Sequence, residues 1–471
     1  MKRNRKKLIF IFLVLIIFAA ILKQNIRKIV NDEEILKQIY GEPIGEDGTI
    51  NNSYFGIEIN GKNAKDTLTG INQAIAYASK KNIENVKLEK GTYIIDSQRD
   101  QKEYHYQEKG ITLKSNMEFD LNGSTIKHIT NNRESYSLIS IIAIDNVTIK
   151  NGILEGDRET HDYNNGSTNE FGHGIDIAGG NNVEIKNLEI RNMTGDGIYT
   201  TNKQINSKYY NSNNINIHDC DIYNCRRQGI SIIVANGVKI YNNQIHNING
   251  TNPQTCIDLE TGGKEYKIEN VKIFNNQFYS TARNIVLQIS KNVIELDVTE
   301  NEIHGDIRIY NAENELNIIK NKIFDGKIRG VLSTDNLTRE QYYVKKVNIS
   351  GNSLENSSIE LSRLNNSIIA NNIIQNGKIF IESMNAAVFN NEVINNSDST
   401  EEYAGNYKIN EEDQNKYTMF VINNKYSGKF SINEKIENNP KLEVKKDYNQ
   451  MQNYINKFNE KNWNITNITF P

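Results

Sequence analysis

Cysteine and proline are scarce in this chain of 471 residues, which contains 3 cysteines and 4 prolines. The cysteines Cys220, Cys225 and Cys256 are too few for a disulfide framework and lack the paired spacing of a zinc site. We therefore expect them to be buried, small apolar residues. An excess of positive charge is missing as well, since the net charge at pH 7 is −3. This balance excludes a broadly basic surface for nucleic acid.

The amino terminus carries a basic segment followed by a hydrophobic one. Residues 1–7 are strongly basic, and an unbroken apolar run of 15 residues extends from Leu8 to Leu22. This order is typical of an export signal or a membrane anchor. No small-x-small cleavage site follows, because Phe18 precedes Ala19 and Ala20, so an uncleaved signal-anchor is favoured over a cleaved signal. We expect residues 1–30 to lie in the membrane and the rest outside the cytoplasm, at the cell surface or secreted if cleavage occurs.

A short phrase, Val-x-Ile-x-x-Asn-x-Ile, recurs through most of the chain. It occupies residues 238–245, and a close copy occupies residues 271–278. Its apolar residues are spaced two apart, as in a β-strand. Looser copies place an asparagine at the same point of the phrase, namely Asn301, Asn321, Asn352, Asn372 and Asn391. The last two intervals are 20 and 19 residues, and a period near twenty predicts a solenoid in which each coil packs on its neighbours.

Stacked coils lie about 4.8 Å apart, which is the spacing of paired strands. Asparagines at one level of successive coils can therefore hydrogen-bond to each other through their side chains. We expect Asn243, Asn276 and the later asparagines of the phrase to form such a ladder inside the solenoid. Leu188 and Cys220 occupy the same level in the preceding coils, so the ladder should begin at Asn243.

Two segments are predicted to be helical and to cover the ends of the solenoid. Asp66 and Thr67 are expected to cap the first, an amphipathic helix with apolar residues at Leu68, Ile71, Ala74, Ile75 and Ala78. Residues 447–463 form the second, with Met451, Tyr454, Ile455 and Phe458 on one face. A first strand is expected near residues 54–59. An open solenoid end needs such a cover.

The beginning of the solenoid resembles a known family. Asp66-Thr67 opens a helix, Val86-Lys87-Leu88 and Gly91-Thr92-Tyr93 follow, and the pattern continues through residues 110–113 and 146–149 to about residue 397. This order is similar to that of the pectate-lyase-like (pectin lyase fold) superfamily, which includes polygalacturonases, polysaccharide lyases, uronan epimerases and phage tailspike depolymerases. The resemblance implies an all-β chain built as a single-stranded right-handed parallel β-helix.

The resemblance and the pattern together suggest four parts. Residues 1–30 form the signal-anchor, residues 31–60 a linker with the first strand, residues 61–400 the β-helix with its amino-terminal capping helix, and residues 401–471 an irregular carboxy-terminal cap with a helix. The interior of such a β-helix is packed, so a substrate must lie along an outer face bordered by inserted loops.

The longest insertions, residues 157–171, 200–213 and 249–255, flank four copies of one short strand. Aligning the isoleucines of these copies inward places four residues in one outward column, namely Asp176, Tyr199, Ser231 and Asp258. Glu260 lies two residues beyond Asp258 on the same face. A neighbouring column at the turn consists of His173, Asp196 and Gln228, with Arg226 and Arg227 beside it. The patch is four coils tall, roughly 15 Å, which suits a few sugar rings of a polysaccharide partner.

Each of these residues also has a purely structural interpretation. The aspartates could be solvated strand or turn residues, and the arginines could be ordinary surface charges. Several such residues in one patch favour function more than any one of them does. Guanidinium groups suit the recognition of carboxylates, which indicates an acidic polysaccharide.

Two reactions fit the patch. Glycoside hydrolysis needs two carboxyl groups, which Asp176, Asp196, Asp258 and Glu260 would supply. Elimination or epimerisation on a uronan needs a base, here His173, Tyr199 or an arginine, and a cation to neutralise the uronate, here Arg226 or Arg227. A bound Ca²⁺, with Asp258 and Glu260 as ligands, is the alternative to that cation; no cofactor is otherwise indicated.

We expect hydrolysis, because carboxylates outnumber candidate bases. Within the resemblance, Gly195-Asp196-Gly197 stands where polygalacturonase-like hydrolases carry Gly-Asp-Asp, so Asp196 is the residue that transfers. Gly172-His173-Gly174 precedes that motif, whereas in those hydrolases the equivalent motif follows it. A third interpretation is a non-catalytic carbohydrate-binding or surface-scaffold protein, since repeats of this kind also build adhesins.

Overall fold

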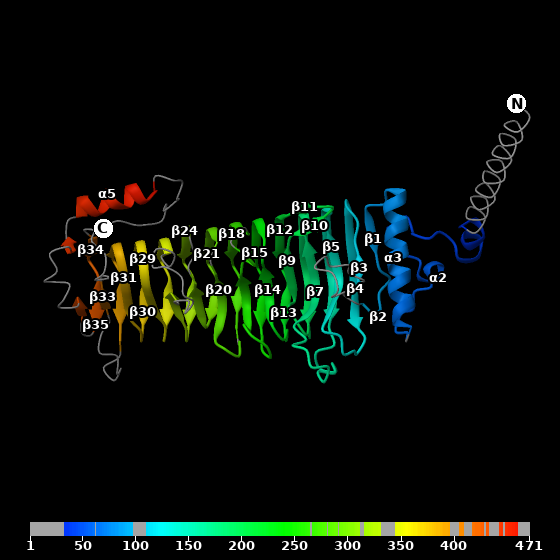
Figure 1. Cartoon of the computed structure of the whole chain (residues 1–471), viewed down its shortest axis with the longest axis horizontal. Helices are drawn as coiled ribbons and strands as arrows, with labels where there is room; N and C mark the ends of the chain where they lie inside the picture. Colours follow the sequence, from blue (N-terminus) through cyan, green and yellow to red (C-terminus); the bar gives the residue numbers. More distant parts are fainter. Residues whose placement is uncertain are drawn as a thin grey trace, which may run out of the picture.

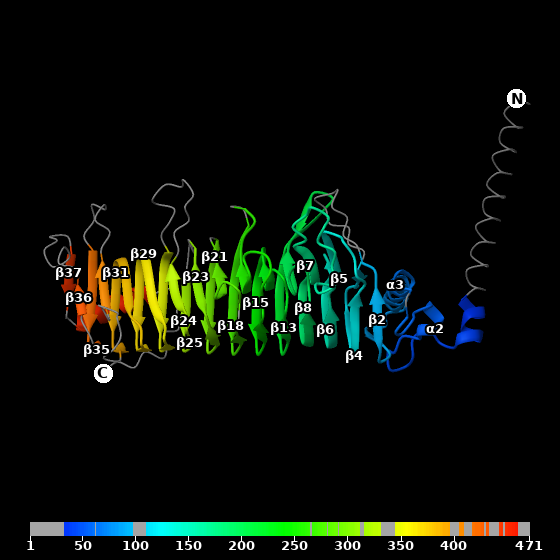
Figure 2. The same cartoon turned by 90° about the horizontal axis from the view of Figure 1, so that it is seen from below.

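The computed structural model describes residues 33–61, 63–97, 110–263, 266–279, 281–290, 292–310, 315–330, 344–395, 405–408, 417–427, 430–432, 442–445 and 448–459. These residues form one long solenoid of stacked coils, with α3 at one end and α5 near the other (Figures 1 and 2). The predicted membrane anchor, residues 1–30, lies outside the described residues. No helix within the described ranges is long and apolar enough to cross a membrane.

Each coil contributes strands to parallel sheets that run the length of the solenoid. Sheet 1 contains β3 (Ile111–Thr112), β5 (Ser135–Ile142), β7 (Phe171–Ala178), β9 (Ile198–Thr201), β14 (Gln228–Ile232), β17 (Thr255–Leu259), β20 (Ile285–Ile289), β23 (Asp306–Ile309) and β26 (Lys327–Gly330). Sheet 2 contains β1 (Asn85–Lys87), β12 (Ser212–His218), β15 (Ala235–Tyr241), β18 (Ile268–Phe274), β21 (Val293–Thr299), β24 (Glu315–Ile319), β27 (Val344–Ser350), β34 (Tyr417–Ile422) and β37 (Leu442–Lys445).

Sheet 3 is made of short strands. They are β2 (Thr92–Ile95), β13 (Asp221–Tyr223), β16 (Gln244–His246), β19 (Gln277–Phe278), β22 (Glu302–His304), β25 (Lys322–Phe324), β28 (Ser353–Glu355), β30 (Ile373–Gln375), β32 (Glu392–Ile394) and β35 (Lys425–Ser427).

Some long strands pass from one sheet into the next. β4 (Met117–His128), β6 (Asp145–Glu155) and β8 (Asn181–Arg191) join sheets 2 and 3, whereas β29 (Ser358–Ala370) and β31 (Ile379–Phe389) join sheets 1 and 2. β33 (Gly405–Lys408) and β36 (Phe430–Ile432) extend sheet 1. β10 (Lys203–Ile205) and β11 (Lys208–Tyr210) form an antiparallel hairpin within one insertion.

The predicted inward positions are confirmed. Val147, Val183, Ile215 and Val238 pair in register on sheet 2 and are all buried. The three cysteines are also buried, and none of them forms a disulfide. An interior of aliphatic side chains in register favours the strand over the helix, because β-branched residues pack well on a pleated surface.

The asparagine ladder is confirmed as well. The Nδ2 atom of each ladder asparagine donates to the Oδ1 atom of the next, at 2.8–3.0 Å, from Asn243 through Asn276, Asn301, Asn321, Asn352, Asn372 and Asn391 to Asn424. The same Oδ1 atoms accept the backbone N–H of the preceding asparagine, as Asn352 does from Asn321 at 2.9 Å. Both ends of each buried amide are therefore satisfied.

The residue before a ladder position is often a second asparagine with another role. Asn242, Asn275, Asn371, Asn390 and Asn423 each have a φ between 53° and 55°, in the left-handed region. Asparagine enters this region more readily than most residues, because its short side chain bonds to nearby backbone. In each Asn-Asn pair the first residue therefore turns the backbone at the corner of a coil. The second residue belongs to the ladder.

The predicted amino-terminal helix is α3 (Ala64–Lys81), which packs Ile71, Ala74, Ile75 and Ala78 into the core beside the first coil. Its N-cap is Asn63, so the prediction that Asp66 and Thr67 cap the helix is wrong. The prediction of a first strand near residues 54–59 is also wrong, since α2 (Asn52–Phe55) and irregular residues occupy that stretch.

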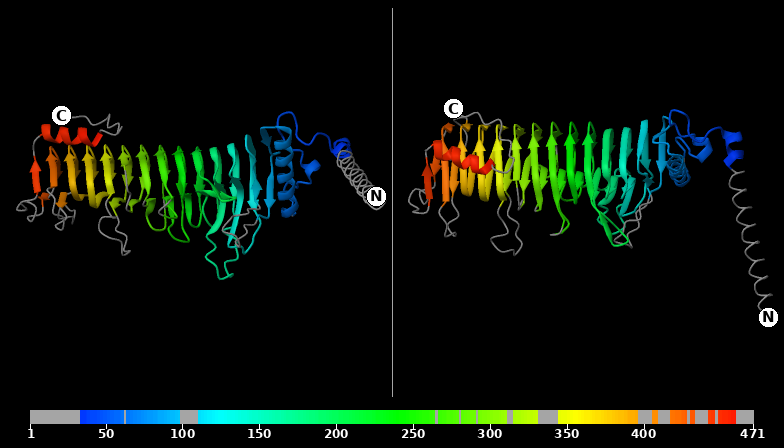
Figure 3. Two further views of the ribbon diagram at one scale, coloured as in Figure 1. Left: turned by 45° about the horizontal axis from the view of Figure 1, so that its top comes forward. Right: turned by 90° about the horizontal axis from the view of Figure 1, so that it is seen from above.

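The carboxy-terminal helix is α5 (Tyr448–Asn459), and it lies along a flank of the last coils rather than across their open end (Figure 3). Its Met451 and Ile455 contact outward-facing apolar residues, namely Ile368, Ala370, Ala387, Phe389 and Phe420. β29 and β31 are apolar on both faces there, so their outer face needs a cover.

Candidate functional site

The predicted column on sheet 1 is present in register. Asp176 pairs with Tyr199, Tyr199 with Ser231, and Ser231 with Asp258. The isoleucines before them, Ile175, Ile198, Ile230 and Ile257, are fully buried in the core. The strands β7, β9, β14 and β17 therefore carry these four side chains at successive levels of one face.

Polar contacts join two of the aspartates through neighbouring coils. The Oδ2 atom of Asp196 accepts hydrogen bonds from Ser231 Oγ at 2.8 Å and from Arg227 Nη1 at 3.0 Å. Arg227 Nη1 also donates to Gln228 Oε1 at 2.5 Å, and the amide of Gln228 donates to Asp258. We call Asp196, Arg227, Gln228, Ser231 and Asp258 the acid–amide cluster.

The acid–amide cluster is covered. Asp196, Gln228, Ser231 and Asp258 have no solvent-exposed surface, and neither has Asp176 in the same column. The prediction that these side chains face an open surface is therefore wrong for Asp176, Asp196 and Asp258. Glu260 is exposed, and Tyr199 is half-buried.

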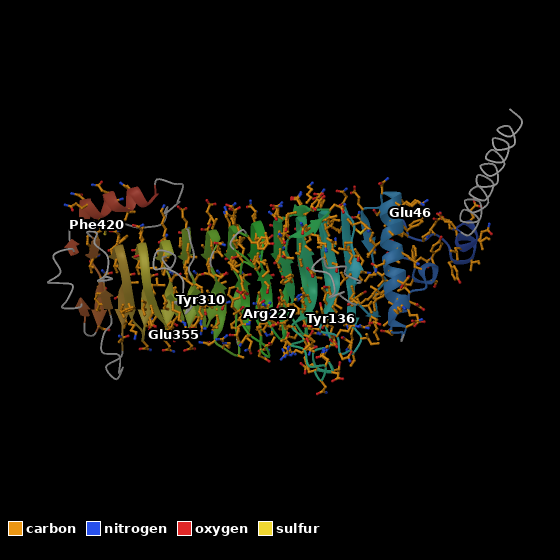
Figure 4. The ribbon with its side chains drawn as sticks, viewed as in Figure 1. Glu46, Tyr136, Arg227, Tyr310, Glu355 and Phe420 are labelled. Carbon is orange, nitrogen blue, oxygen red and sulfur yellow. The ribbon has the colours of Figure 1, made fainter. Side chains whose placement is uncertain are left out.

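Arg227 is the member of the cluster that reaches solvent, with 16 % of its side chain exposed. It lies near the middle of the solenoid, in line with Tyr136 and Tyr310 along the axis (Figure 4). Its Nε atom lies 3.7 Å from an oxygen of Glu170, at the end of the insertion before β7. Arg226 anchors the same insertion, donating from Nη1 to Thr168 O at 2.7 Å and lying over the ring of Tyr163.

That insertion has a polar core of its own, which sequence reasoning missed. His161 Nδ1 lies 2.9 Å from Asp157 Oδ2, and both side chains are buried. Asn131 donates from Nδ2 to the same Asp157 oxygen at 2.8 Å. A buried carboxylate with a histidine and an amide as partners fixes the insertion against the neighbouring coil.

His173 is buried rather than exposed to a substrate. Its ring stacks on Tyr199, with centroids 4.7 Å apart and planes at 2°. The backbone N–H of Asp196 donates to His173 Nδ1 at 3.2 Å. This contact assigns the lone pair to Nδ1 and the proton to Nε2, and it makes His173 a residue that positions Asp196.

Burial dominates the electrostatics of the site. It raises the pKa of Asp196 to about 6, although Arg227 and Ser231 favour the charged form. Burial and the charge of Glu260 raise the pKa of Asp258 well above its usual range. Burial tends to lower the pKa of Arg227, but the charges of Asp196 and Asp258 outweigh it, so this pKa is raised.

A pH titration of stability is expected to reveal the Asp196 carboxyl. Because its pKa rises from 3.8 to about 6 on folding, the folded state holds the proton more tightly, so its contribution to stability is present below about pH 4 and lost as the pH rises to about 6. The loss corresponds to at most about 3 kcal/mol. We expect urea unfolding between pH 4 and 6.5 to show this slope in the wild type and a flatter one in Asp196→Asn. Equal slopes would contradict the assignment.

The site does not fit the proposed Ca²⁺. Among the described residues, no group of three or more histidine, cysteine or acidic side chains could hold a metal ion. Both oxygens of Asp258 face amide donors, from Gln228 and, at 3.1 Å, from Gln288. An N–H group aimed at a carboxylate oxygen occupies the position that a cation would need.

Gln288 also was missed by sequence reasoning. It follows Asp258 in the same column, because β20 pairs with β17 in register. The alternation of Leu287 and Ile289 around it was the available signal. The connection from β17 to β18 is longer than the one from β14 to β15, so the position of Gln288 in the column was not evident from the sequence.

Comparison with known proteins agrees with this architecture. The family model for the right handed beta helix region matches residues 173–346. This match agrees with the parallel β-helix that the structure shows over the same residues. The matched residues include β9, β14 and β17 and all five members of the acid–amide cluster.

Two curated proteins of Bacillus subtilis (strain 168) are similar in sequence. The uncharacterized protein YclG is 32% identical over 243 residues, which cover 49% of this chain and 41% of YclG. The SPbeta prophage-derived uncharacterized protein YorA is 35% identical over 151 residues, covering 31% of this chain and 26% of YorA. The chain thus spans less than half the length of either relative.

Similar solved structures include an epimerase and a depolymerase. The A-module of the Azotobacter vinelandii mannuronan C-5 epimerase AlgE6 is 16% identical, with a TM-score of 0.46, covering 83% of this chain and 97% of that one. The tailspike gp49 of Acinetobacter baumannii bacteriophage Fri1, a capsular polysaccharide depolymerase, is 11% identical, with a TM-score of 0.48, covering 87% and 66%. At these identities the likeness concerns the fold alone.

Proposed function

We propose that the protein acts on an acidic polysaccharide outside the cytoplasm, by hydrolysis of a glycosidic bond at the acid–amide cluster. The observation that carries this proposal is the pair of buried carboxylates, Asp196 and Asp258, with raised pKa values and shared amide and guanidinium partners. Burying carboxylates costs free energy, and the solenoid needs no acid there for its own stacking. Groups with such perturbed pKa values cluster at functional sites.

Asp258 and Glu260 have the properties of an acid pair. The raised pKa of Asp258 keeps its proton near neutral pH, as a general acid requires, whereas Glu260 is exposed to solvent. The two residues lie on the same face, two positions apart, which is about 6.6 Å along a strand. The backbone N–H of Glu260 still donates to Ile232 O at 3.0 Å, so the strand direction continues to that point. In the proposed hydrolysis Asp258 is the acid and Glu260 is the base that activates a water.

Arg227 has the position of a substrate-binding residue. Its Nε atom is buried without a hydrogen-bond partner among the described residues, so the guanidinium retains a donor. A carboxylate of the substrate would compete with Asp196 and Glu170 for this group. Arg227 would move toward the substrate in that exchange and uncover Asp258.

Elimination or epimerisation is less well supported. Its base would be His173, Tyr199 or an arginine, but His173 is fully buried, stacked on Tyr199 and engaged at Nδ1 by the Asp196 amide. A second candidate function is binding without turnover, as in a carbohydrate-binding or scaffold protein. The complete burial of Asp176, Asp196 and Asp258 favours it.

The test is a panel of acidic and neutral polysaccharides incubated with the full chain. Products are measured as new reducing ends and as absorbance of unsaturated uronates. We expect new reducing ends on an acidic polysaccharide and no unsaturated product. An unsaturated product would show that the reaction is elimination and would overturn hydrolysis. Binding without any product across the panel would favour the second candidate function, binding without turnover.

A further inference from the structure

The face that carries the acid–amide cluster changes its charge two coils further on. In the column of Asp258, the next residues are Gln288 on β20, Arg308 on β23 and Arg329 on β26, each paired in register with the one before. One outward column thus runs from carboxylate through amide to guanidinium. The arginines stand about 10 and 14 Å from Asp258, at about 4.8 Å per coil.

The two arginines share one carboxylate. Asp306 Oδ2 lies 2.5 Å from Arg329 Nη2 and 3.6 Å from Arg308 Nη2. Its other oxygen accepts the backbone N–H of Lys327 at 3.0 Å. One negative charge between two guanidinium groups leaves a positive charge on this part of the face.

The column continues with a carboxylate, because Glu360 pairs in register with Arg329. Lys327 and Lys378 lie beside Glu360, at 2.9 Å and 3.6 Å. The whole protein has a net charge of −3, so a local excess of positive charge does not follow from composition. A network that served only to hold the coils together would gain most from balanced pairs.

The arginines also retain unused donors. The Nε atoms of Arg308 and Arg329 are buried and have no hydrogen-bond partner among the residues that the structure describes. The side chains remain 14 % and 31 % exposed, so a ligand can reach the guanidinium groups from solvent. A guanidinium group offers a planar fork of donors that matches carboxylate and sulfate oxygens.

We propose that Arg308 and Arg329 form an anion-binding subsite for a carboxylate or sulfate group of a glycan chain. The chain would extend along the solenoid axis from the acid–amide cluster. This inference rests on the proposed function for the identity of the ligand as a glycan. It adds a site two to three coils from the acids and assigns the ligand a negative charge there.

The experiment measures the binding of three hexasaccharides to the full chain by isothermal titration calorimetry: an oligogalacturonate, a heparin-derived oligosaccharide and the neutral cellohexaose. The first two distinguish a carboxylate from a sulfate. The variant is the double substitution Arg308→Gln and Arg329→Gln. Arg329→Lys is the second variant, since it keeps the charge beside Asp306 but loses the fork. The control is Lys272→Gln, which removes an exposed positive charge on sheet 2.

We expect an acidic hexasaccharide to bind, the double variant to weaken it about 10- to 100-fold, and Lys272→Gln to leave it unchanged. Arg329→Lys should give an intermediate loss with unchanged thermal unfolding. An acidic ligand that binds the Arg329→Lys and double variants as tightly as the wild type overturns the subsite, and so does binding of cellohexaose alone. Either result would overturn the subsite alone. The proposed function would still be supported if the polysaccharide panel shows hydrolysis, because turnover is measured separately.

Discussion

Replacing Asn321 by aspartate is expected to lower the free energy of unfolding by about 3–5 kcal/mol. The Nδ2 atom of Asn321 donates to Val298 O at 2.9 Å, to Ile319 O at 3.2 Å and to Asn352 Oδ1 at 3.0 Å. Aspartate has the same shape but no donor, so it would set an oxygen against three acceptors at a position that is almost fully buried. Burial of the added charge contributes to the loss.

The measurement is urea unfolding followed by circular dichroism, at one pH for all variants. Asn270→Asp is the matched control, because Asn270 is exposed and its side chain donates to Asn236 at the surface, at 2.7 Å. We expect the control to lose less than about 1 kcal/mol. Equal losses in the two variants would show that the interior ladder adds nothing beyond a surface ladder.

Replacing Asp258 by asparagine is expected to reduce turnover about 10²- to 10⁴-fold, as the loss of a general acid does. Asparagine keeps the shape of the side chain and can still accept from Gln288, but it loses the acceptor for Gln228 and cannot supply a proton. The fold should survive, because a neutral amide replaces a buried acid whose ionisation is already opposed by burial.

Asp297→Asn is the matched control for this loss. Asp297 also lies on a strand, β21, and accepts an amide from the next coil, from Asn317 at 2.8 Å, but on sheet 2. The measurement is kcat/KM on the polysaccharide that the panel identifies, with thermal unfolding recorded for each variant. Full turnover in a folded Asp258→Asn variant would exclude Asp258 as the acid.

The sequence predicted the scaffold more completely than the site. Asparagine recurs at one point of the repeated phrase from Asn243 to Asn391, and this recurrence predicted the ladder. Identical residues at one level of successive coils meet when the coils stack in register. The same logic placed Asp176, Tyr199, Ser231 and Asp258 in one column. Both predictions depend on a period that is visible in the chain.

The burial of Asp176, Asp196 and Asp258 could not be predicted from the period of the sequence. Arg227 reaches Asp196 and Glu170 from outside the column, and contacts such as Asp157 with His161 hold the insertion before β7. Those contacts join residues outside the period. The flank position of α5 was missed for a related reason, since it depends on apolar residues such as Phe389 that face outward on β31.

The most direct test of the account is a crystal structure of the Asp258→Asn variant soaked with an acidic hexasaccharide that the panel shows to be bound. We predict that the saccharide lies on sheet 1 over β14 and β17, with a carboxylate or sulfate at Arg227 and a sugar ring beside Glu260. A saccharide bound only to sheet 2, sheet 3 or α5, with Arg227 still on Asp196, would contradict the account.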